Sequence, residues 1–288
     1  MRAGVGVVFG RRGRHSLLCR GHHCQRLPVP EQGQFRAALI EGRNAIKAAP
    51  SDTKGYVLLG AISNTLGQFR QALGALEPHA ENSQDPDLLF TLADAYLGSR
   101  KFRSASQLLD QHATLLEGSD GARFHNLSAE VDQSLRDLPA ARTHYEAALA
   151  AEPGHVKARL GIAGLELASN NRGTAQDMLG TILQEHPSNI DALIARARFA
   201  LQSDDVDAES SLSSALASLP NTDIFTPQRI EILVALKNVL TQQGRTSEAL
   251  TYSEMLSEAF PGSLETESAM RDAVALFEEG RLDEAVPR

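Results

Sequence analysis

Two cysteines and two histidines near the start of the chain have the residue types of a metal site. Cys19-x2-His22-His23-Cys24 brings together thiol and imidazole groups, which are zinc ligands. A structural zinc site combines such a pair with a second, distant pair, and the sequence contains no second pair. We therefore expect no bound metal. With only two cysteines, no disulfide framework holds the rest of the chain together.

The other motifs that could support catalysis are incomplete or missing. Gly4-Val5-Gly6 and Gly10 are one residue off the glycine pattern of dinucleotide sites, and no strand is predicted before them. The sequence has no Gly-x-Ser-x-Gly, no Walker glycine loop and no His-Glu-x-x-His. We interpret His79, His112 and His144 as exposed or capping residues. The sequence thus predicts no catalytic residue and no cofactor, and we expect a protein that is not an enzyme.

Charge is distributed unevenly along the 288 residues. Residues 1–30 contain six arginines and no acidic residue, which leaves 22 basic and 36 acidic groups in the remainder. An acidic body of this kind lacks the basic surface that grips phosphate backbones, so we expect no nucleic-acid partner. No run approaches the ~18 apolar residues of a membrane-spanning helix, so we expect no such segment.

Residues 1–32 differ from everything that follows. Their weak apolar segment precedes an Arg-Arg-Gly-Arg run, whereas a secretory signal has its charges first. Pro28 and Pro30 prevent a helix across that region. We predict a basic, disordered tail over residues 1–32, whose first residue need not be the natural start of the protein.

The rest of the chain is organised by repetition. Ala141, Tyr145 and Ala148 fall on one face of a helix that Pro153 ends, and similar patterns return downstream. The prolines at 153, 187, 220 and 261 are separated by 34, 33 and 41 residues. A period of about 34 residues is typical of stacked helical hairpins. The long last spacing predicts an inserted loop over 221–227, with Thr226 capping the helix that follows.

Small residues recur where paired helices must approach closely. The composition is poor in aromatic residues (5%) and has no tryptophan or sustained Val/Ile/Thr alternation, which favours helices over sheets. Two helices joined by a short turn accept only Gly, Ala or Ser where their backbones nearly touch. The residues at these positions are Gly60, Ala93, Ser128, Gly161 and Ala195 in first helices, and Ala72, Ala105, Ala141, Ala175, Ala208 and Ala249 in second helices.

These residues resemble the tetratricopeptide repeat (TPR), whose pattern is aromatic-x2-Leu-Gly-x2-Tyr, then Ala-x3-Phe, then Pro. Tyr56-x2-Leu59-Gly60, Leu92-Ala93-x2-Tyr96 and Ala141-x3-Tyr145 carry the resemblance. It covers residues 33–288, as about six full repeats with partial units at both ends. The resemblance implies an all-α fold, a right-handed superhelical solenoid of TPR helical hairpins whose first helices form a concave inner wall.

A narrower resemblance concerns bacterial secretion. The Ala-rich units, residues 160–168 among them, are similar to TPR proteins encoded with bacterial PEP-CTERM/exosortase and exopolysaccharide systems, and to the solenoid halves of cellulose-export subunits. Five lysines against 23 arginines indicate a GC-rich bacterial gene. The resemblance implies a role in exopolysaccharide production or protein export, at a periplasmic or membrane-associated location. A natural N-terminus without a signal would instead indicate the cytoplasm.

The family resemblance implies a non-catalytic scaffold that binds a peptide or partner protein in the concave groove. Asp94 and Asp132 stand where chaperone-binding relatives need cations, so we do not expect capture of a C-terminal carboxylate. The inward-facing positions that we predict to contact a partner are Lys54, Val57, Asn64, Phe90, Asp94, His125, Asp132 and Arg196.

Two alternatives remain open. The chain could be the N-terminal helical fragment, or regulatory half, of a larger enzyme or export assembly. A last hairpin from Thr266 stops at Arg288, where Ala273 and Phe277 would expose an apolar face. Because solenoid ends need polar caps, this predicts self-association through the C-terminal end.

Overall fold

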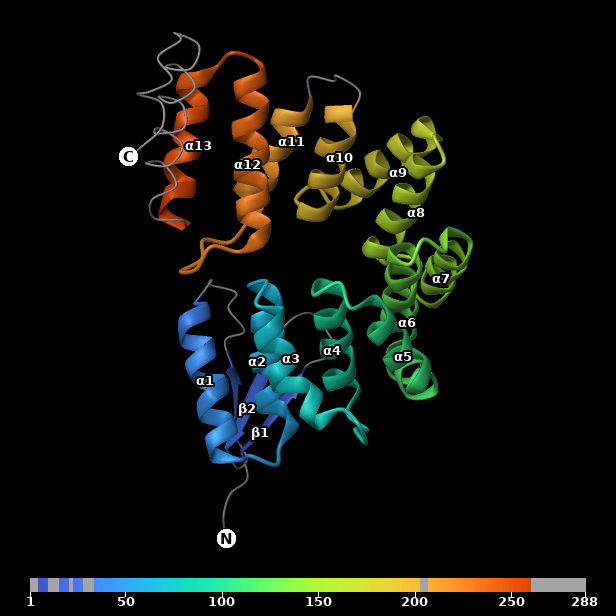
Figure 1. Cartoon of the computed structure of the whole chain (residues 1–288), viewed down its shortest axis with the longest axis vertical. Coiled ribbons are helices and arrows are strands. Elements are labelled where there is room, and N and C mark those ends of the chain that lie inside the picture. The colour runs from blue at the N-terminus through green and yellow to red at the C-terminus, as the bar shows by residue number, and fades with distance from the viewer. Residues whose placement is uncertain (1–4, 10–15, 21–22, 28–33, 203–206, 260–288) are drawn as a thin grey trace, which may run out of the picture.

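Helical hairpins that repeat along the chain form the main body of the structure (Figure 1). The computed structural model describes residues 5–9, 16–20, 23–27, 34–202 and 207–259. In this part of the chain, first and second helices of successive hairpins alternate. The first helices are α2 (Thr53–Thr65), α4 (Pro86–Gly98), α6 (Ala113–Ser134), α8 (Val156–Ala168), α10 (Ile190–Gln202) and α12 (Pro227–Gln242). The second helices are α1 (Phe35–Ala48), α3 (Phe69–Leu76), α5 (Phe102–Gln111), α7 (Leu138–Ala151), α9 (Arg172–Glu185), α11 (Asp207–Ser218) and α13 (Thr246–Ala259), and a 3-10 turn, η1 (Glu77–His79), extends α3.

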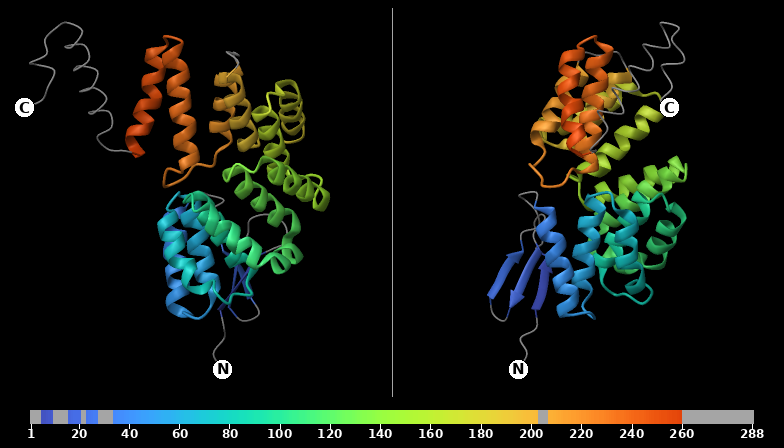
Figure 2. Two further views of the ribbon diagram at one scale, coloured as in Figure 1. Left: turned by 45° about the vertical axis from the view of Figure 1, so that its right-hand side comes forward. Right: turned by 60° about the vertical axis from the view of Figure 1, so that its left-hand side comes forward.

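The predicted all-α solenoid is confirmed for the helical body. The two helices of each hairpin pack together, and each second helix packs on the first helix of the next hairpin. The array bends as it proceeds, so that α12 and α13 come to lie across from α1 and α2 (Figures 1 and 2). None of the described helices is long and apolar enough to cross a bilayer.

Three short strands precede the helices, in a segment predicted to be disordered. β1 (Val5–Phe9), β2 (Ser16–Arg20) and β3 (His23–Leu27) form an antiparallel sheet in the order β1-β2-β3, with Cys19 opposite Cys24. Only two residues separate β2 from β3, which is the commonest length of a hairpin connection. The prediction from composition overlooked this local signal. β1 lies beside α2, so the sheet is joined to the start of the array.

Side-chain caps mark the start of every described first helix. Each cap accepts a hydrogen bond from a backbone N–H of the first turn, which would otherwise have no partner within the helix. Asp120 interrupts α6 with non-helical backbone angles and caps its second part, so the first helix of that hairpin runs from residue 121. The caps are Asp52, Asp85, Asp120, His155, Asn189 and Thr226. The predicted inserted loop and its Thr226 cap are thereby confirmed.

Five of the turns inside the hairpins share one backbone conformation. Gly67, Arg100, Arg136, Asn170 and Gly244 have positive φ angles between 62° and 75°. The N–H of the residue after each one donates to the helix carbonyl five residues earlier, as in a Schellman motif. This repeated stop directs the second helices of these five hairpins back along their first helices.

Large side chains fill the space next to the small residues of the seam. A Cβ atom on Gly60 would lie 2.6 Å from Leu76, and one on Gly161 would lie 2.2 Å from the Tyr145 ring. Likewise, a Cβ atom on Gly98 would lie 2.0 Å from the ring of Phe69. The predicted requirement for small residues therefore holds at Gly60 and Gly161, and Gly98 is a further position of this kind.

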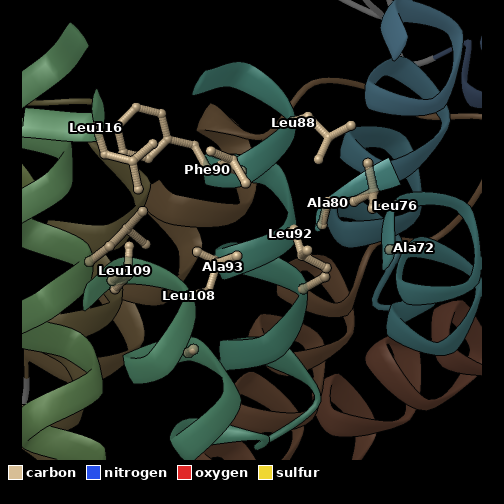
Figure 3. Close-up of a cluster of buried hydrophobic side chains, with 14 of the residues drawn as sticks. Ala72, Leu76, Ala80, Leu88, Phe90, Leu92, Ala93, Leu108, Leu109 and Leu116 are labelled. Atoms are coloured by element: carbon tan, nitrogen blue, oxygen red, sulfur yellow. The ribbon is translucent and has the colours of Figure 1, made fainter. Parts of the chain in front are cut away.

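A large cluster of buried apolar side chains lies between α2 and α6 (Figure 3). Leu76, Leu88, Phe90, Leu109 and Leu116 are each at most 2% exposed there. Their side chains come from successive hairpins and meet between them, so neighbouring hairpins bury each other's apolar faces.

A contact between the two ends closes the bend of the array. The loop before α12 reaches the start of α1, where Phe35 donates its backbone N–H to the carboxylate of Asp223 over 2.7 Å. Ile224 of the same loop packs against the apolar cluster between α1 and α2. The hairpin predicted from Thr266 and its apolar residues Ala273 and Phe277 lie outside the described residues.

We expect Gly161→Ala to destabilise the fold by about 1–3 kcal/mol, because the added methyl group overlaps the buried ring of Tyr145. Gly180→Ala is the matched control, since a Cβ there meets nothing within 4 Å and alanine favours a helix interior by about 0.5–1 kcal/mol. Urea unfolding of both variants measures the difference. Equal midpoints for the two variants would contradict close packing at this seam.

Candidate binding pocket on the inner wall

An open pocket of about 370 Å³ lies on the inner wall of the array. Four successive first helices, α6, α8, α10 and α12, supply nearly all of its lining, and Tyr145 of α7 adds to it from beneath. Volumes of about 300–1,000 Å³ are typical of sites that hold small ligands or side chains. Its lining residues are Glu130, Gln133, Tyr145, Lys157, Leu160, Gly161, Gly164, Asp191, Ile194, Ala195, Arg198, Gln228 and Glu231.

The pocket lies where α8 lacks the large residues of the repeat pattern. Lys157 stands four residues before Gly161, as Tyr56 stands four residues before Gly60. Gly164 stands three residues after Gly161, where α4 has an aromatic residue three residues after Ala93. Lysine extends into solvent and glycine has no side chain, so neither fills the space that the aromatic residues fill elsewhere.

The first helices also separate along the array. α2 packs directly against α4, and α4 against α6, whereas α6 and α8 make only a small contact. The space left between α8 and α10 is lined by residues of both helices, among them Leu160 and Ile194. Weaker packing of successive first helices therefore coincides with the pocket.

Tyr145 forms a rigid floor beneath α8. It is 2% exposed, and its hydroxyl donates to Oε1 of Gln133 over 2.9 Å. Burial raises the pKa of Tyr145, and the negative charges of Glu130 and Asp132 add to the effect. The phenol therefore remains neutral and keeps this hydrogen bond at physiological pH.

Polar contacts hold the wall formed by α10 and α12. Arg198 of α10 forms an ion pair with Glu231 of α12. Nearby, Nε2 of Gln228 donates to Oδ1 of Asp191 over 2.9 Å. The position of the α12 start is thus tied to α10 at two points along the pocket.

Glu130 carries a desolvated carboxyl group in the pocket. Burial raises its pKa, and the negative charges of Asp94 and Asp191 raise it further. The positive charge of Lys157 and a 2.7 Å hydrogen bond from Nδ2 of Asn126 act in the opposite direction. Lys157 is itself exposed, and no described residue forms a direct ion pair with it. A ligand that brings a hydrogen-bond donor to Glu130, or an acceptor to Lys157, would find an available group.

Two of the residues predicted to contact a partner lie in the core. Val57 is 3% exposed and Phe90 is 2% exposed, and both belong to the apolar cluster between α2 and α6. Arg123 covers the Phe90 ring at 4.5 Å from its centroid and donates to Oδ2 of Asp94 over 2.9 Å. Val57 and Phe90 therefore stabilise the stacking of hairpins, because the space that would expose them is filled by neighbouring units. Asp94 stays partly exposed.

The other predicted residues are spread along the array. Asn64 donates from Nδ2 to the backbone carbonyl of Thr91 over 2.9 Å and so links α2 to α4. Arg196 donates from Nε to the hydroxyl of Ser211 over 2.8 Å and turns toward α11, away from the pocket. Lys54 is partly exposed in the first turn of α2. None of the eight predicted residues lines the pocket itself.

His125 and Asp132 belong to a polar cluster that joins α6 to α7. Nδ1 of His125 lies 3.1 Å from Nδ1 of His144, so one imidazole donates to the other. Carboxylates flank the pair, with Glu117 at 3.4 Å from His125 and Asp132 at 3.8 Å from His144. Within the described ranges, no group of three or more His, Cys, Asp or Glu side chains has the arrangement of a metal site. We read this cluster as an interhelical contact.

The comparisons with known proteins agree with this architecture. Residues 134–198 match the family model described as tetratricopeptide repeat. No curated protein sequence matches the chain significantly. The chain therefore has a tetratricopeptide repeat segment, which includes α7, α8 and α9.

Solved structures extend the similarity in fold beyond that segment. A TPR protein from Thermus thermophilus is 22% identical, with 58% of this chain and 89% of that one covered and a TM-score of 0.50. A tetratricopeptide repeat protein from Parabacteroides merdae is 16% identical, with 81% and 90% covered and a TM-score of 0.54. A chain of the APC/C hetero-tetramer Cut9–Hcn1 is 12% identical, with a TM-score of 0.57; the match covers 87% of this chain but only 48% of that one. The helical body therefore has the fold of a TPR solenoid.

We expect Glu130→Gln to stabilise the protein at pH 7. Because the pKa of Glu130 is raised in the folded state, folding becomes less favourable as the pH rises from the ordinary carboxyl range, and glutamine removes that cost. The gain should disappear at about pH 4, where the carboxyl is largely protonated in both states.

Glu166→Gln is the control of opposite sign. Hydrogen bonds from Asn171 and Arg142 lower the pKa of Glu166, so its loss should destabilise the protein at pH 7 and matter less as the pH falls. Urea unfolding at both pH values measures each effect. If Glu130→Gln stabilises the protein equally at both pH values, the carboxyl group of Glu130 is not desolvated in the folded state.

Proposed function

We propose that this chain is a non-catalytic scaffold that binds a peptide or a segment of a partner protein on its inner wall. The observation that carries the proposal is the pocket, which four successive first helices form where the repeat pattern lacks its large residues. Stacked hairpins present extended concave surfaces, which solenoid proteins use for binding. A partner segment lying along this wall would place one large side chain in the pocket.

The lining suits a segment that carries both polar and apolar groups. Leu160 and Ile194 offer apolar surface, while Lys157 and Glu130 offer charges of opposite sign close to each other. Main-chain amides of a bound segment are donors and acceptors, so they match both groups. Of the residues predicted from sequence, we keep Lys54, Asp94 and Asp132 as proposed further contacts, because they stand on first helices and are partly exposed.

We place this scaffold in bacterial exopolysaccharide production or protein export. Support for this setting comes from the Ala-rich units, residues 160–168 among them, which resemble TPR proteins encoded with those systems. α8 contains this segment and also supplies the centre of the pocket.

A peptide selected on the wild-type protein should lose affinity when Lys157 is reversed in charge. We would select from a phage-displayed random peptide library, synthesise the enriched peptide with a fluorophore, and measure its anisotropy with each variant. Lys157→Glu should change the affinity by about tenfold or more, equivalent to about 1.4 kcal/mol, because the charge stands at the pocket.

Lys47→Glu is the matched control. Lys47 is exposed in the last turn of α1 and lies outside the pocket, so its reversal should leave peptide affinity unchanged. If the library yields no binder, or if both variants bind the selected peptide equally, the pocket is not the binding surface.

A further inference from the structure

The loop between α11 and α12 supplies the helix cap that the start of α1 lacks. Gln34 stands at the capping position of α1 but makes no side-chain cap. Oδ1 of Asp223 instead accepts the N–H of Phe35 over 2.7 Å, and Oδ2 accepts the N–H of Arg36 over 3.1 Å. A carboxylate at this end also interacts favourably with the helix dipole. The cap reaches α1 from 188 residues away in sequence.

A second contact from the same loop is apolar. Ile224 packs against the cluster that Phe35 and Ala38 of α1 form with side chains of α2. α1 is a second helix at the N-terminal end of the helical array, so this face receives no packing from a preceding hairpin within the described residues. Ile224 covers part of it in the way that a neighbouring hairpin would.

A third contact lies at the turn between α2 and α3. A Cβ atom on Gly67 would stand 2.8 Å from Cγ of Pro227, the first residue of α12. Gly67 also has a φ of 70°, which disfavours a side chain for backbone reasons alone. The turn of the first complete hairpin and the start of the last described one therefore approach as closely as glycine allows.

The loop and the start of α12 are held together as one unit. Thr226 accepts the backbone N–H of Arg229 and caps α12, while Nη2 of Arg229 donates back to the carbonyl of Pro220 over 2.8 Å. Immediately after this cap, Gln228 and Glu231 line the pocket on the inner wall. A displacement of the loop would therefore carry one wall of the pocket with it.

We propose that residues 219–226 act as a latch that closes the array on its own N-terminal end and sets the width of the inner pocket. Closure rests on Asp223, Ile224 and the Gly67–Pro227 approach, a small set of contacts in which Asp223 itself is exposed. Opening would break them together and leave the helix pairs intact, since no hairpin seam is involved. The consequence for binding rests on the proposed function: a segment that fits the pocket better in one state shifts the latch toward that state, and closure changes its affinity by the same factor.

Spin-label distance measurements test the latch without any ligand. In a Cys19→Ser, Cys24→Ser background of the full chain, labels at Arg43→Cys on α1 and Ser247→Cys on α13 span the closure, and both positions are exposed. We expect one dominant distance when the loop is intact. Asp223→Ala should shift the ratio of open to closed molecules by about 2- to 30-fold, the range that corresponds to a lost N-cap.

Matched controls separate the latch from general effects on the loop and on folding. Asn221→Ala changes another exposed residue of the same loop and should leave the distance unchanged. Gly67→Ala should open the array, whereas Gly244→Ala, at a φ of 75° with nothing within 4 Å of its Cβ, should not. These four variants leave the helix seams untouched, and far-ultraviolet circular dichroism verifies their helix content.

Unchanged distance distributions in both Asp223→Ala and Gly67→Ala would overturn the latch. A longer distance in both variants, with the controls unchanged, supports the latch whether or not a peptide ligand is found. Failure of the proposed function can therefore be told apart from failure of the latch. If a selected peptide exists, Asp223→Ala should alter its affinity while Asn221→Ala should not. Equal affinity in an opened variant would show that closure does not set the pocket.

Discussion

The close approach of paired helices at small residues is the constraint on which the rest of this structure depends. A single helical hairpin is too thin to bury its own apolar face, so it must stack on neighbours. Gly60, Gly98 and Gly161 let large side chains from adjacent helices enter the seams. A Cβ atom added at any of these glycines would overlap the neighbouring side chain. Each large side chain therefore fixes the distance between helices. Where a large side chain is absent, as at Gly164, space remains between successive first helices.

The pocket and the fold are consequences of the same packing rule. Between α2 and α6 the large residues are present, and the inner positions Val57 and Phe90 are buried by their neighbours. At α8 the two aromatic positions of the repeat pattern hold Lys157 and Gly164, and the inner wall becomes hollow and polar. Function in this architecture is thus expected where the repeat departs from its pattern, since conforming units use their side chains for stacking.

Much of the fold follows from sequence because its signals are local. The positions of small residues, the turn at Gly67 and the Thr226 cap each depend on residues within a few positions of one another, and the structure agrees with them. The strand pairing over residues 5–27 was not predicted, because composition does not reflect the two-residue connection between β2 and β3.

The site was harder to predict because it depends on spacing between units. The inward positions were predicted from the repeat pattern, and Val57 and Arg196 do lie on first helices. The pattern does not state how tightly neighbouring hairpins pack, and this packing decides which of the side chains are exposed. The replacement of aromatic residues by Lys157 and Gly164 was visible in the sequence and is the signal that would have located the pocket. The contact of Asp223 with α1 was not accessible in this way. This contact depends on the curvature of the array, which is the sum of small rotations between successive hairpins.

The most direct test of this account restores the missing aromatic residue. A Cβ atom at Gly164 meets only the side chain of Gln133, at 4.0 Å, so a tyrosine there can extend into the pocket. The account predicts that Gly164→Tyr keeps or raises the midpoint of thermal unfolding, and that a peptide selected on the wild-type protein loses about tenfold or more in affinity, equivalent to about 1.4 kcal/mol. Wild-type affinity in a variant of unchanged stability would contradict the claim that the pocket at α8 is where this scaffold binds.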